Sequence, residues 1–245
     1  MFLHGLLVNG SLWDDVVALL PGRECVVLEL PLGAHAVPAA DRSTVTPVGV
    51  ADWVAAELER RGLSGVTVVA NDTGGAIAQL LVTRHPERVA RLVLTPCDAF
   101  EVFPPWIFKP LFLLGRSRLT LSAFLQALRV PRAERLPIAF GWLTKRGSRE
   151  VQAGWARALL RGGEPLADAV HFFRHVDPGL LLDAAPKLRA FEGEVVIAWP
   201  PEDRCFPISL GRRLAASFSN ARLVGIEDSY SFVPLDQPAA LAALL

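Results

Sequence analysis

Short apolar runs alternate with amphipathic stretches along the first hundred residues of the chain. The apolar runs are rich in β-branched residues or end at prolines, which is typical of buried strands, whereas the stretches between them repeat with helical periodicity. Alternation of this kind predicts a parallel sheet covered by helices. The expected strands lie at Met1–Leu3, Cys25–Leu30, Val66–Val69 and Arg91–Leu94, and the expected helices at Leu12–Leu20, Val50–Arg61 and from the turn after Asp72 to near His85.

The pattern changes between residues 99 and 186. This stretch has no clear strand, and its Phe, Trp and Leu residues recur at helical spacings with basic residues between them. We predict a helical cap insertion over residues 99–186, with residues 1–98 and 187–245 forming one α/β core whose sheet is mostly parallel. The sheet is expected to resume with strands at Glu194–Trp199 and Ala221–Ile226 and helices at Ile208–Phe218 and Pro238–Leu245.

The stretch Val66–Gln79 carries the main chemical signal. A β-branched run breaks at Asn71-Asp72-Thr73-Gly74-Gly75, and a helical pattern follows. A strand, a sharp turn with small residues and a helix are the context of a nucleophile elbow, and Asp72 occupies the position of the nucleophile. The start of a helix also favours an anion, which helps to keep Asp72 ionised. Taken alone, the stretch equally fits an Asp that caps an ordinary helix.

Composition narrows the classes of partner. The chain has 245 residues, 51% of them hydrophobic, and 25 basic residues balance 25 acidic ones, so nothing favours nucleic acid or an anionic membrane as a partner. No apolar segment has the length of a membrane span, and no secretory leader is visible. Three cysteines fit neither a metal-binding spacing nor a disulfide framework, which indicates a reducing, cytoplasmic setting. No G-x-G-x-x-G motif is present, so no cofactor is expected.

The elbow, an early His4-Gly5 pair and a helical block between two halves of a sheet together resemble the α/β-hydrolase family along nearly the whole chain. An Asp at the elbow is similar to the branch of haloalkane dehalogenases and epoxide hydrolases. The resemblance implies that Asp72 attacks a substrate carbon and forms an alkyl-enzyme ester, which a His-activated water then cleaves. It implies an oxyanion hole from the backbone N–H groups of Leu6 and Thr73. Family members usually have two further strands first, so the sheet resembles an N-terminally trimmed form.

The resemblance also places the acid of a catalytic triad. Asp203 follows the strand Glu194–Trp199, at the position where the family carries its acid, although an Asp beside prolines also suits a turn. Asp98, after the preceding strand, is the alternative position that some members use.

The catalytic His of the family has no counterpart at its expected position. Alignment on Asp236-Gln237-Pro238 puts Ser231 there, with Tyr230 beside it. Neither hydroxyl is a general base near neutral pH. His171 and His175 share a helix face, but no third ligand accompanies them, so no metal site is expected. Either one would reach Asp72 only if the insertion folds over it.

Three further departures from the family stand near the expected site. Halide-binding members carry a Trp where this chain has Thr73, and Asn71 replaces a His that often precedes the nucleophile. Epoxide hydrolases use tyrosines of the cap, whereas the only Tyr here is Tyr230, outside the insertion.

We expect a mainly apolar pocket at the carboxyl ends of the strands, beneath the insertion. Asp72 and Asp203 are the candidate catalytic residues, and Leu6 and Thr73 the candidate oxyanion donors. The candidate pocket residues are His4, Asn71, Asp98, Phe100, Phe103, Trp106, Tyr230 and Ser231.

These features favour an enzyme that acts on a small apolar substrate and hydrolyses a carbon–halogen, epoxide or ester bond. Two alternatives stay open: a lyase, isomerase or cyclase in which Asp72 moves protons, and a non-catalytic binder of an apolar ligand. The substrate and the oligomeric state do not follow from the sequence.

Overall fold

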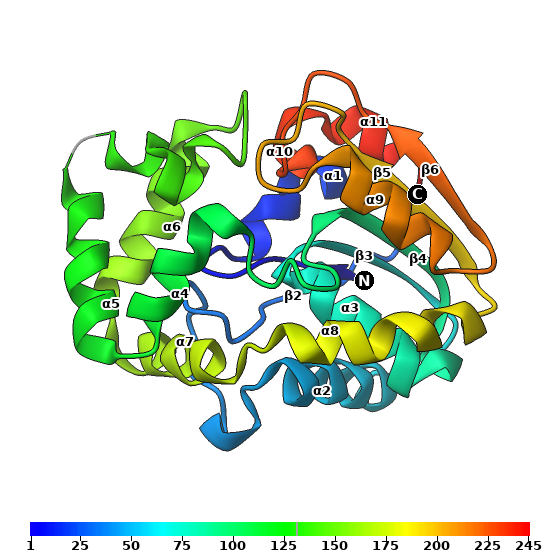
Figure 1. The fold of residues 1–245 in the computed structure, drawn as a ribbon, viewed down its shortest axis with the longest axis horizontal. Coiled ribbons are helices and arrows are strands. Elements are labelled where there is room, and N and C mark those ends of the chain that lie inside the picture. Colours follow the sequence, from blue (N-terminus) through cyan, green and yellow to red (C-terminus); the bar gives the residue numbers. More distant parts are fainter. Residues whose placement is uncertain (131) are drawn as a thin grey trace.

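The computed structural model describes residues 1–130 and 132–245. Within them, six parallel strands form one sheet in the order β2-β1-β3-β4-β5-β6 (Figure 1). Helices flank the sheet on both faces, which confirms the predicted α/β class. The strands are β1 (Phe2–Leu3), β2 (Val27–Leu28), β3 (Val66–Asp72), β4 (Val89–Cys97), β5 (Glu194–Trp199) and β6 (Ala221–Gly225).

All six strands lie where the apolar runs predicted them, and β5 has the predicted bounds, but the lengths of the other strands differ from the expectation. The edge strand β2 has two residues, because only Val27 and Leu28 pair with β1. The central strand β3 extends to Asp72, since β1 and β4 pair with it on either side.

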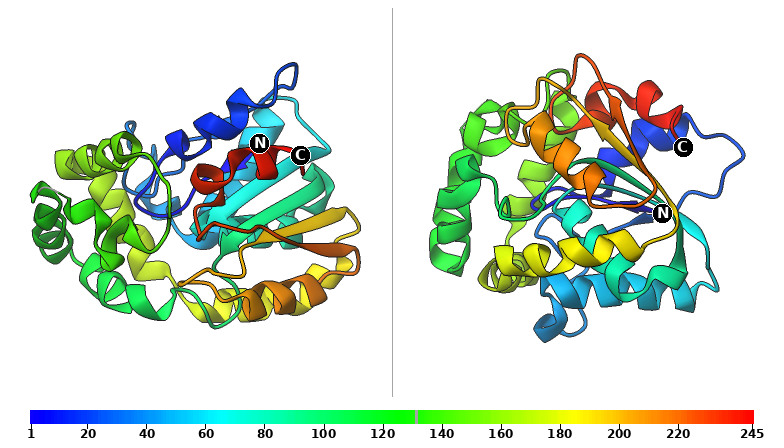
Figure 2. Two further views of the ribbon diagram at one scale, coloured as in Figure 1. Left: turned by 90° about the horizontal axis from the view of Figure 1, so that it is seen from above. Right: turned by 45° about the vertical axis from the view of Figure 1, so that its right-hand side comes forward.

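The helices cover the sheet on two faces. Figure 2 shows α1 and α11 on one face and α3, α8 and α9 on the other, with α2 packed on α3. Helix α2 begins three residues before its expected start, because the Thr46 side chain accepts the Gly49 N–H and Pro47 fits the first turn. The helices are α1 (Asp14–Ala18), α2 (Pro47–Arg60), α3 (Thr73–Arg84), α4 (Lys109–Gly115), α5 (Arg118–Leu125), α6 (Arg149–Arg161), α7 (Gly163–His175), α8 (Pro178–Ala184), α9 (Ile208–Ala216), α10 (Val233–Asp236) and α11 (Pro238–Ala242).

The segment between β4 and β5 divides into two parts. Helices α4, α5, α6 and α7 gather to one side of the sheet, whereas α8 lies against α3 (Figure 1). The expected insertion over residues 99–186 therefore includes α8, although that helix packs on the core. Among the described residues, no helix combines the length and apolarity that crossing a membrane requires.

A buried polar cluster fastens α7 to the loop that follows β2. Asp168 of α7 is fully buried and accepts hydrogen bonds from His35 Nε2 at 3.2 Å, Ala39 N at 2.9 Å and Arg42 Nε at 2.8 Å. His35 Nδ1 accepts the Gly33 N–H, so the imidazole proton sits on Nε2. Burial lowers the pKa of His35, which keeps it neutral in this cluster.

We expect Asp168→Ala to destabilise the protein by about 3 kcal/mol, because it leaves the buried His35 without an acceptor and removes the carboxylate that Ala39 N and Arg42 contact. Urea unfolding of both proteins measures the difference. Asp183→Ala is the matched control, since Asp183 is an exposed carboxylate on α8. Equal unfolding midpoints for Asp168→Ala and the wild type would show that the cluster contributes nothing.

Candidate active site

The chain turns sharply where β3 meets α3. The backbone of Asp72 has φ +54°, a conformation that residues other than glycine rarely adopt. The next residues bring α3 close to the sheet: a Cβ on Gly74 would lie 2.5 Å from Leu3 O, and one on Gly75 would lie 2.3 Å from Cys97 Cβ. The two glycines are therefore required by close packing, as the sequence predicted.

The Asp72 carboxylate lies against the loop that follows β1. The Leu6 N–H donates to Asp72 Oδ2 at 3.2 Å, and a Cβ on Gly5 would lie 2.1 Å from the same oxygen. Gly5 thus leaves the space that the carboxylate occupies. The surrounding apolar groups raise the pKa of Asp72 to about 6, and the N–H groups of Thr73 and Leu6 offset only part of this rise. The side chain is therefore mostly ionised at pH 7.

An apolar cavity separates the sheet from the insertion. It holds about 590 Å³ of empty space, including solvent at its mouth, and Asp72, Thr73 and Asp98 line its sheet side. Aromatic and aliphatic side chains of the insertion line the rest, including Phe108, Leu111, Phe112, Phe124, Leu128 and Phe140. A site of this kind takes small apolar molecules and presents carboxyl and hydroxyl groups at one end.

Asp98 is the second carboxyl group of the cavity. It is 1% exposed, and its Oδ2 accepts the Thr73 hydroxyl at 3.0 Å. Its Oδ1 is buried and has no hydrogen-bond partner in the part of the chain that the structure describes. Burial and the nearby Asp72 charge raise the pKa of Asp98 well above its usual range, which favours the protonated form of this carboxyl group.

Asp203 forms the turn after β5. Its Oδ1 accepts the N–H groups of Cys205 and Phe206, each at 2.7 Å, whereas Oδ2 is buried and has no partner among the described residues. Burial raises the pKa of Asp203 to about 6, although Phe206, Ser231 and Cys205 favour the charged form. Asp203 thus stabilises its turn through Oδ1, while Oδ2 takes no part in the hydrogen bonds of the turn.

Ser231 lies close to Asp203 at the position expected for a His. Its Oγ is buried without a hydrogen-bond partner of ordinary geometry among the described residues. Asn71 Nδ2 donates to the Ser231 carbonyl at 2.8 Å and to Thr95 Oγ1 at 2.8 Å. Asn71 therefore joins the ends of β3 and β4 to the Ser231 loop and does not line the cavity.

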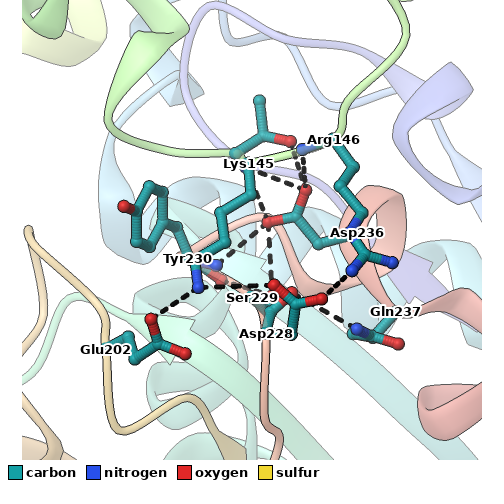
Figure 3. Close-up of polar contacts among 9 residues, drawn as sticks. Lys145, Arg146, Glu202, Asp228, Ser229, Tyr230, Asp236 and Gln237 are labelled. Atoms are coloured by element: carbon teal, nitrogen blue, oxygen red, sulfur yellow. Dashed lines mark hydrogen bonds and ion pairs between the residues drawn. The ribbon is translucent and has the colours of Figure 1, made fainter.

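A polar network anchors the loop that carries Ser231 to the insertion (Figure 3). Asp236 accepts the N–H groups of Lys145 at 2.9 Å, Arg146 at 2.8 Å and Tyr230 at 2.9 Å. The Tyr230 ring lies between two cations, 5.0 Å from Lys145 Nζ and 4.7 Å from the Arg204 guanidinium. Tyr230 thus belongs to this network, outside the cavity lining.

None of the histidines in the described chain lines the cavity. Both nitrogens of the His4 ring form hydrogen bonds with backbone groups. Nδ1 donates to Gly5 O at 2.8 Å, and Nε2 accepts the Leu30 N–H at 2.9 Å. This ring orders the loop that presents Leu6. His171 and His175 stack on α7 with ring centroids 4.4 Å apart. No group of three metal-ligating side chains occurs in residues 1–130 and 132–245.

The aromatic residues expected in the pocket wall lie elsewhere. Phe100 packs beneath the Arg213 guanidinium at 3.9 Å, Phe103 is fully buried away from the cavity, and Trp106 is 64% exposed. Phe100, Phe103 and Trp106 are the aromatic residues nearest to the end of β4, but the cavity wall comes from residues farther along the chain. The helical spacing of Phe108, Leu111 and Phe112 was the available signal.

We expect Asp203→Asn to stabilise the protein at pH 8. The pKa of Asp203 is about 6 in the folded protein and near 4 in the unfolded chain. The contribution of Asp203 to the free energy of unfolding is therefore lost as pH rises through 6. Asn keeps an oxygen for Cys205 N and Phe206 N and carries no charge. The gain should reach about 3 kcal/mol at pH 8 and vanish below about pH 4. Urea unfolding at several pH values measures it, with exposed Glu192→Gln as the control; a less stable variant at pH 8 would contradict this assignment.

The family comparison agrees with this geometry. A family model described as the alpha/beta hydrolase fold matches residues 1–238. The chain therefore belongs to the α/β-hydrolase family. A search of curated proteins found no match.

Solved structures with similar folds come from enzymes of several kinds. The haloalkane dehalogenase DbeA from Bradyrhizobium elkani has a TM-score of 0.78 and 18% identity, over 98% of this chain and 86% of that one. A thermophilic esterase from Thermogutta terrifontis has a TM-score of 0.75 and 18% identity, over 99% and 86%. Est816, described as an N-acyl homoserine lactone degrading enzyme, has a TM-score of 0.69 and 19% identity, over 99% and 90%. At these identities the similarity establishes the fold and leaves the chemistry to the site.

Proposed function

We propose that the protein is an enzyme in which Asp72 attacks a carbon atom of a small apolar substrate and forms an alkyl ester. One observation carries the proposal: the Asp72 carboxylate stands at a strained turn, lines an apolar cavity and has one oxygen held by the Leu6 N–H. Oδ2 is thus occupied, which leaves Oδ1 as the attacking atom. The apolar walls position the substrate and exclude water from the attack.

The N–H groups of Leu6 and Thr73 act as the oxyanion hole in this proposal. Both favour the charged form of the Asp72 carboxyl group. When water later attacks the carbonyl carbon of the ester, negative charge develops on the oxygen that Leu6 already holds. The same donors therefore serve both steps without rearrangement.

The helical insertion serves as a cap in this proposal, since its side chains form most of the cavity wall. Its apolar surface favours a small apolar organic substrate. The three cysteines are free, which fits a reducing cytoplasm.

Cleavage of the ester is the slow step of the proposed reaction. Asp203 and Ser231 stand side by side, but among the residues that the structure describes no imidazole lines the cavity at Asp72, where it could activate water. A hydroxyl group at position 231 does not replace that base near neutral pH. We infer that the ester on Asp72 accumulates during turnover.

Intact-protein mass spectrometry after incubation with iodohexane and with hexene oxide tests this proposal. We expect one adduct, which peptide mapping assigns to Asp72. Labelling confined to the three cysteines, or no labelling by either reagent, would overturn it.

The raised pKa of Asp72 favours a second candidate function. A carboxylate with a pKa of about 6 accepts and returns a proton efficiently near neutral pH, and such a reaction needs no His. An isomerase or lyase of this kind would exchange the α-hydrogens of cyclohexanone in D₂O without forming an adduct. Proton NMR of the ketone measures the exchange and separates the two functions.

A further inference from the structure

We propose that Asp98 is a catalytic acid that protonates the leaving oxygen of an epoxide, so that the site takes apolar epoxides in preference to alkyl halides. The inference rests on the proposed function, in which Asp72 attacks carbon. Asp72 and Asp98 line the same cavity, from the ends of adjacent strands β3 and β4. Nothing in the role of Asp72 as a nucleophile requires a second carboxyl group at this place.

Hydrogen bonding indicates which Asp98 oxygen carries the proton. The Thr73 hydroxyl donates to Oδ2, so Oδ2 acts as an acceptor. The remaining Oδ1 is buried without a partner within the described residues. A buried donor without an acceptor is unfavourable, and a substrate oxygen in the cavity would supply the missing acceptor. A carboxylic acid O–H at Oδ1 is thus the donor that the cavity offers to a substrate.

The surroundings keep Asp98 protonated while Asp72 is charged. The charge that acts on this carboxyl group is that of Asp72, and the neighbouring Cys97 thiol is kept neutral by burial, which raises its pKa. Burial and the Asp72 charge both raise the pKa of Asp98. Two carboxyl groups in one apolar cavity therefore hold a single negative charge, as in other carboxyl pairs that share a proton.

Epoxide opening preserves this charge. An Asp72 oxygen forms a bond to the epoxide carbon, the carbon–oxygen bond breaks, and its electron pair moves to the oxygen. That oxygen takes the Asp98 proton and becomes a hydroxyl group. Asp72 is then a neutral ester and Asp98 a carboxylate, so the cavity holds one negative charge before and after the step.

A halide substrate would use the site differently. Its leaving ion needs no proton but must be stabilised as an anion, and Asp98 offers it one O–H donor. Thr73 stands beside Asp72 and directs its hydroxyl to Asp98 instead. The insertion has no Tyr, because the only Tyr of the chain is Tyr230. Asp98 is therefore the acid available to an epoxide oxygen.

Matched electrophiles test the assignment. Hexene oxide and iodohexane carry the same carbon chain, and only the first needs a proton on its leaving atom. At pH 8, where Asp72 is ionised, we expect Asp98→Asn to slow ester formation from hexene oxide by about 10²–10⁴-fold and to leave the rate with iodohexane nearly unchanged. Glu101→Gln, an exposed carboxyl near Asp98 in the chain, is the control and should change neither rate.

The outcomes separate this inference from the proposed function. If Asp98→Asn slows both reagents equally or neither, the inference is wrong and Asp72 remains the nucleophile. If neither reagent labels Asp72 in the wild type, the proposed function and the inference both fail.

The wild type provides a test that does not depend on the folding of the variant. Labelling by iodohexane should rise with pH through about 6 and then level off, as Asp72 ionises. Labelling by hexene oxide should rise in the same way and fall again once Asp98 ionises. The same profile with both reagents would contradict the role of Asp98.

Discussion

Asp72→Asn should abolish ester formation with iodohexane and hexene oxide, with a loss of at least about 10³-fold in rate, as expected for removal of a nucleophile. The amide keeps an oxygen that accepts the Leu6 N–H, so the turn is preserved, but it is a poor nucleophile. Intact-mass time courses of both proteins measure the loss. An adduct that forms equally fast in the variant would show that another residue is the nucleophile.

The same substitution should also change stability. Burial raises the pKa of Asp72 to about 6, so its ionisation costs folding free energy as pH rises from about 4 to 8. We therefore expect Asp72→Asn to be more stable than the wild type at pH 8 and no more stable below about pH 4. A gain in stability together with lost reactivity distinguishes a removed nucleophile from a damaged fold.

Ser231→His should shorten the lifetime of the Asp72 ester by about 10²–10⁴-fold, because it supplies the missing general base. Ser231 adjoins the unpaired Asp203 Oδ2, which would accept one imidazole N–H and leave the other nitrogen for water. The position is fully buried, so the larger side chain should cost about 1–3 kcal/mol of stability. The decay of the ester after removal of free iodohexane measures the effect.

Two further variants separate the effect of the general base from the effect of a larger side chain at position 231. Ser231→Asn enlarges the side chain without adding a base and should leave the ester as long-lived as in the wild type. Ser231→His combined with Asp203→Asn should lose most of the gain, because the imidazole loses its orienting carboxylate. Equal lifetimes in Ser231→His and Ser231→Asn would contradict the interpretation of Ser231 as a vacant base position.

Local patterns predicted the features that depend on nearby residues. The β-branched run, the break at Asp72 and the two glycines identified the turn at the end of β3, because each requirement lies within a few residues of sequence. The alternation of apolar runs predicted the parallel sheet for the same reason. The sequence placed Asp98 in the pocket, but not the hydrogen bond that it accepts from the Thr73 hydroxyl, which comes from the start of α3, 25 positions earlier.

Contacts between segments far apart in the chain could not be predicted from the sequence. The contact between His35 and Asp168 spans 133 positions, and the bonds from Asp236 to the Lys145 segment span about 90. Hydrophobic periodicity carries no information on such pairs, so neither contact could be predicted from the sequence. The wrong choice of wall aromatics has the same origin: the path of the chain after β4 decides which rings face Asp72.

Two of the buried carboxylates, Asp168 and Asp236, also restrict how the insertion can move relative to the core. One holds α7 to the loop after β2, and the other holds the segment before α6 to the C-terminal loop. A rigid-body movement of the whole insertion would break the hydrogen bonds of both carboxylates, at a cost of several kcal/mol each. We therefore expect a ligand to enter and leave by local fluctuation of α4 and α5, which contribute Phe112 and Phe124 to the cavity wall.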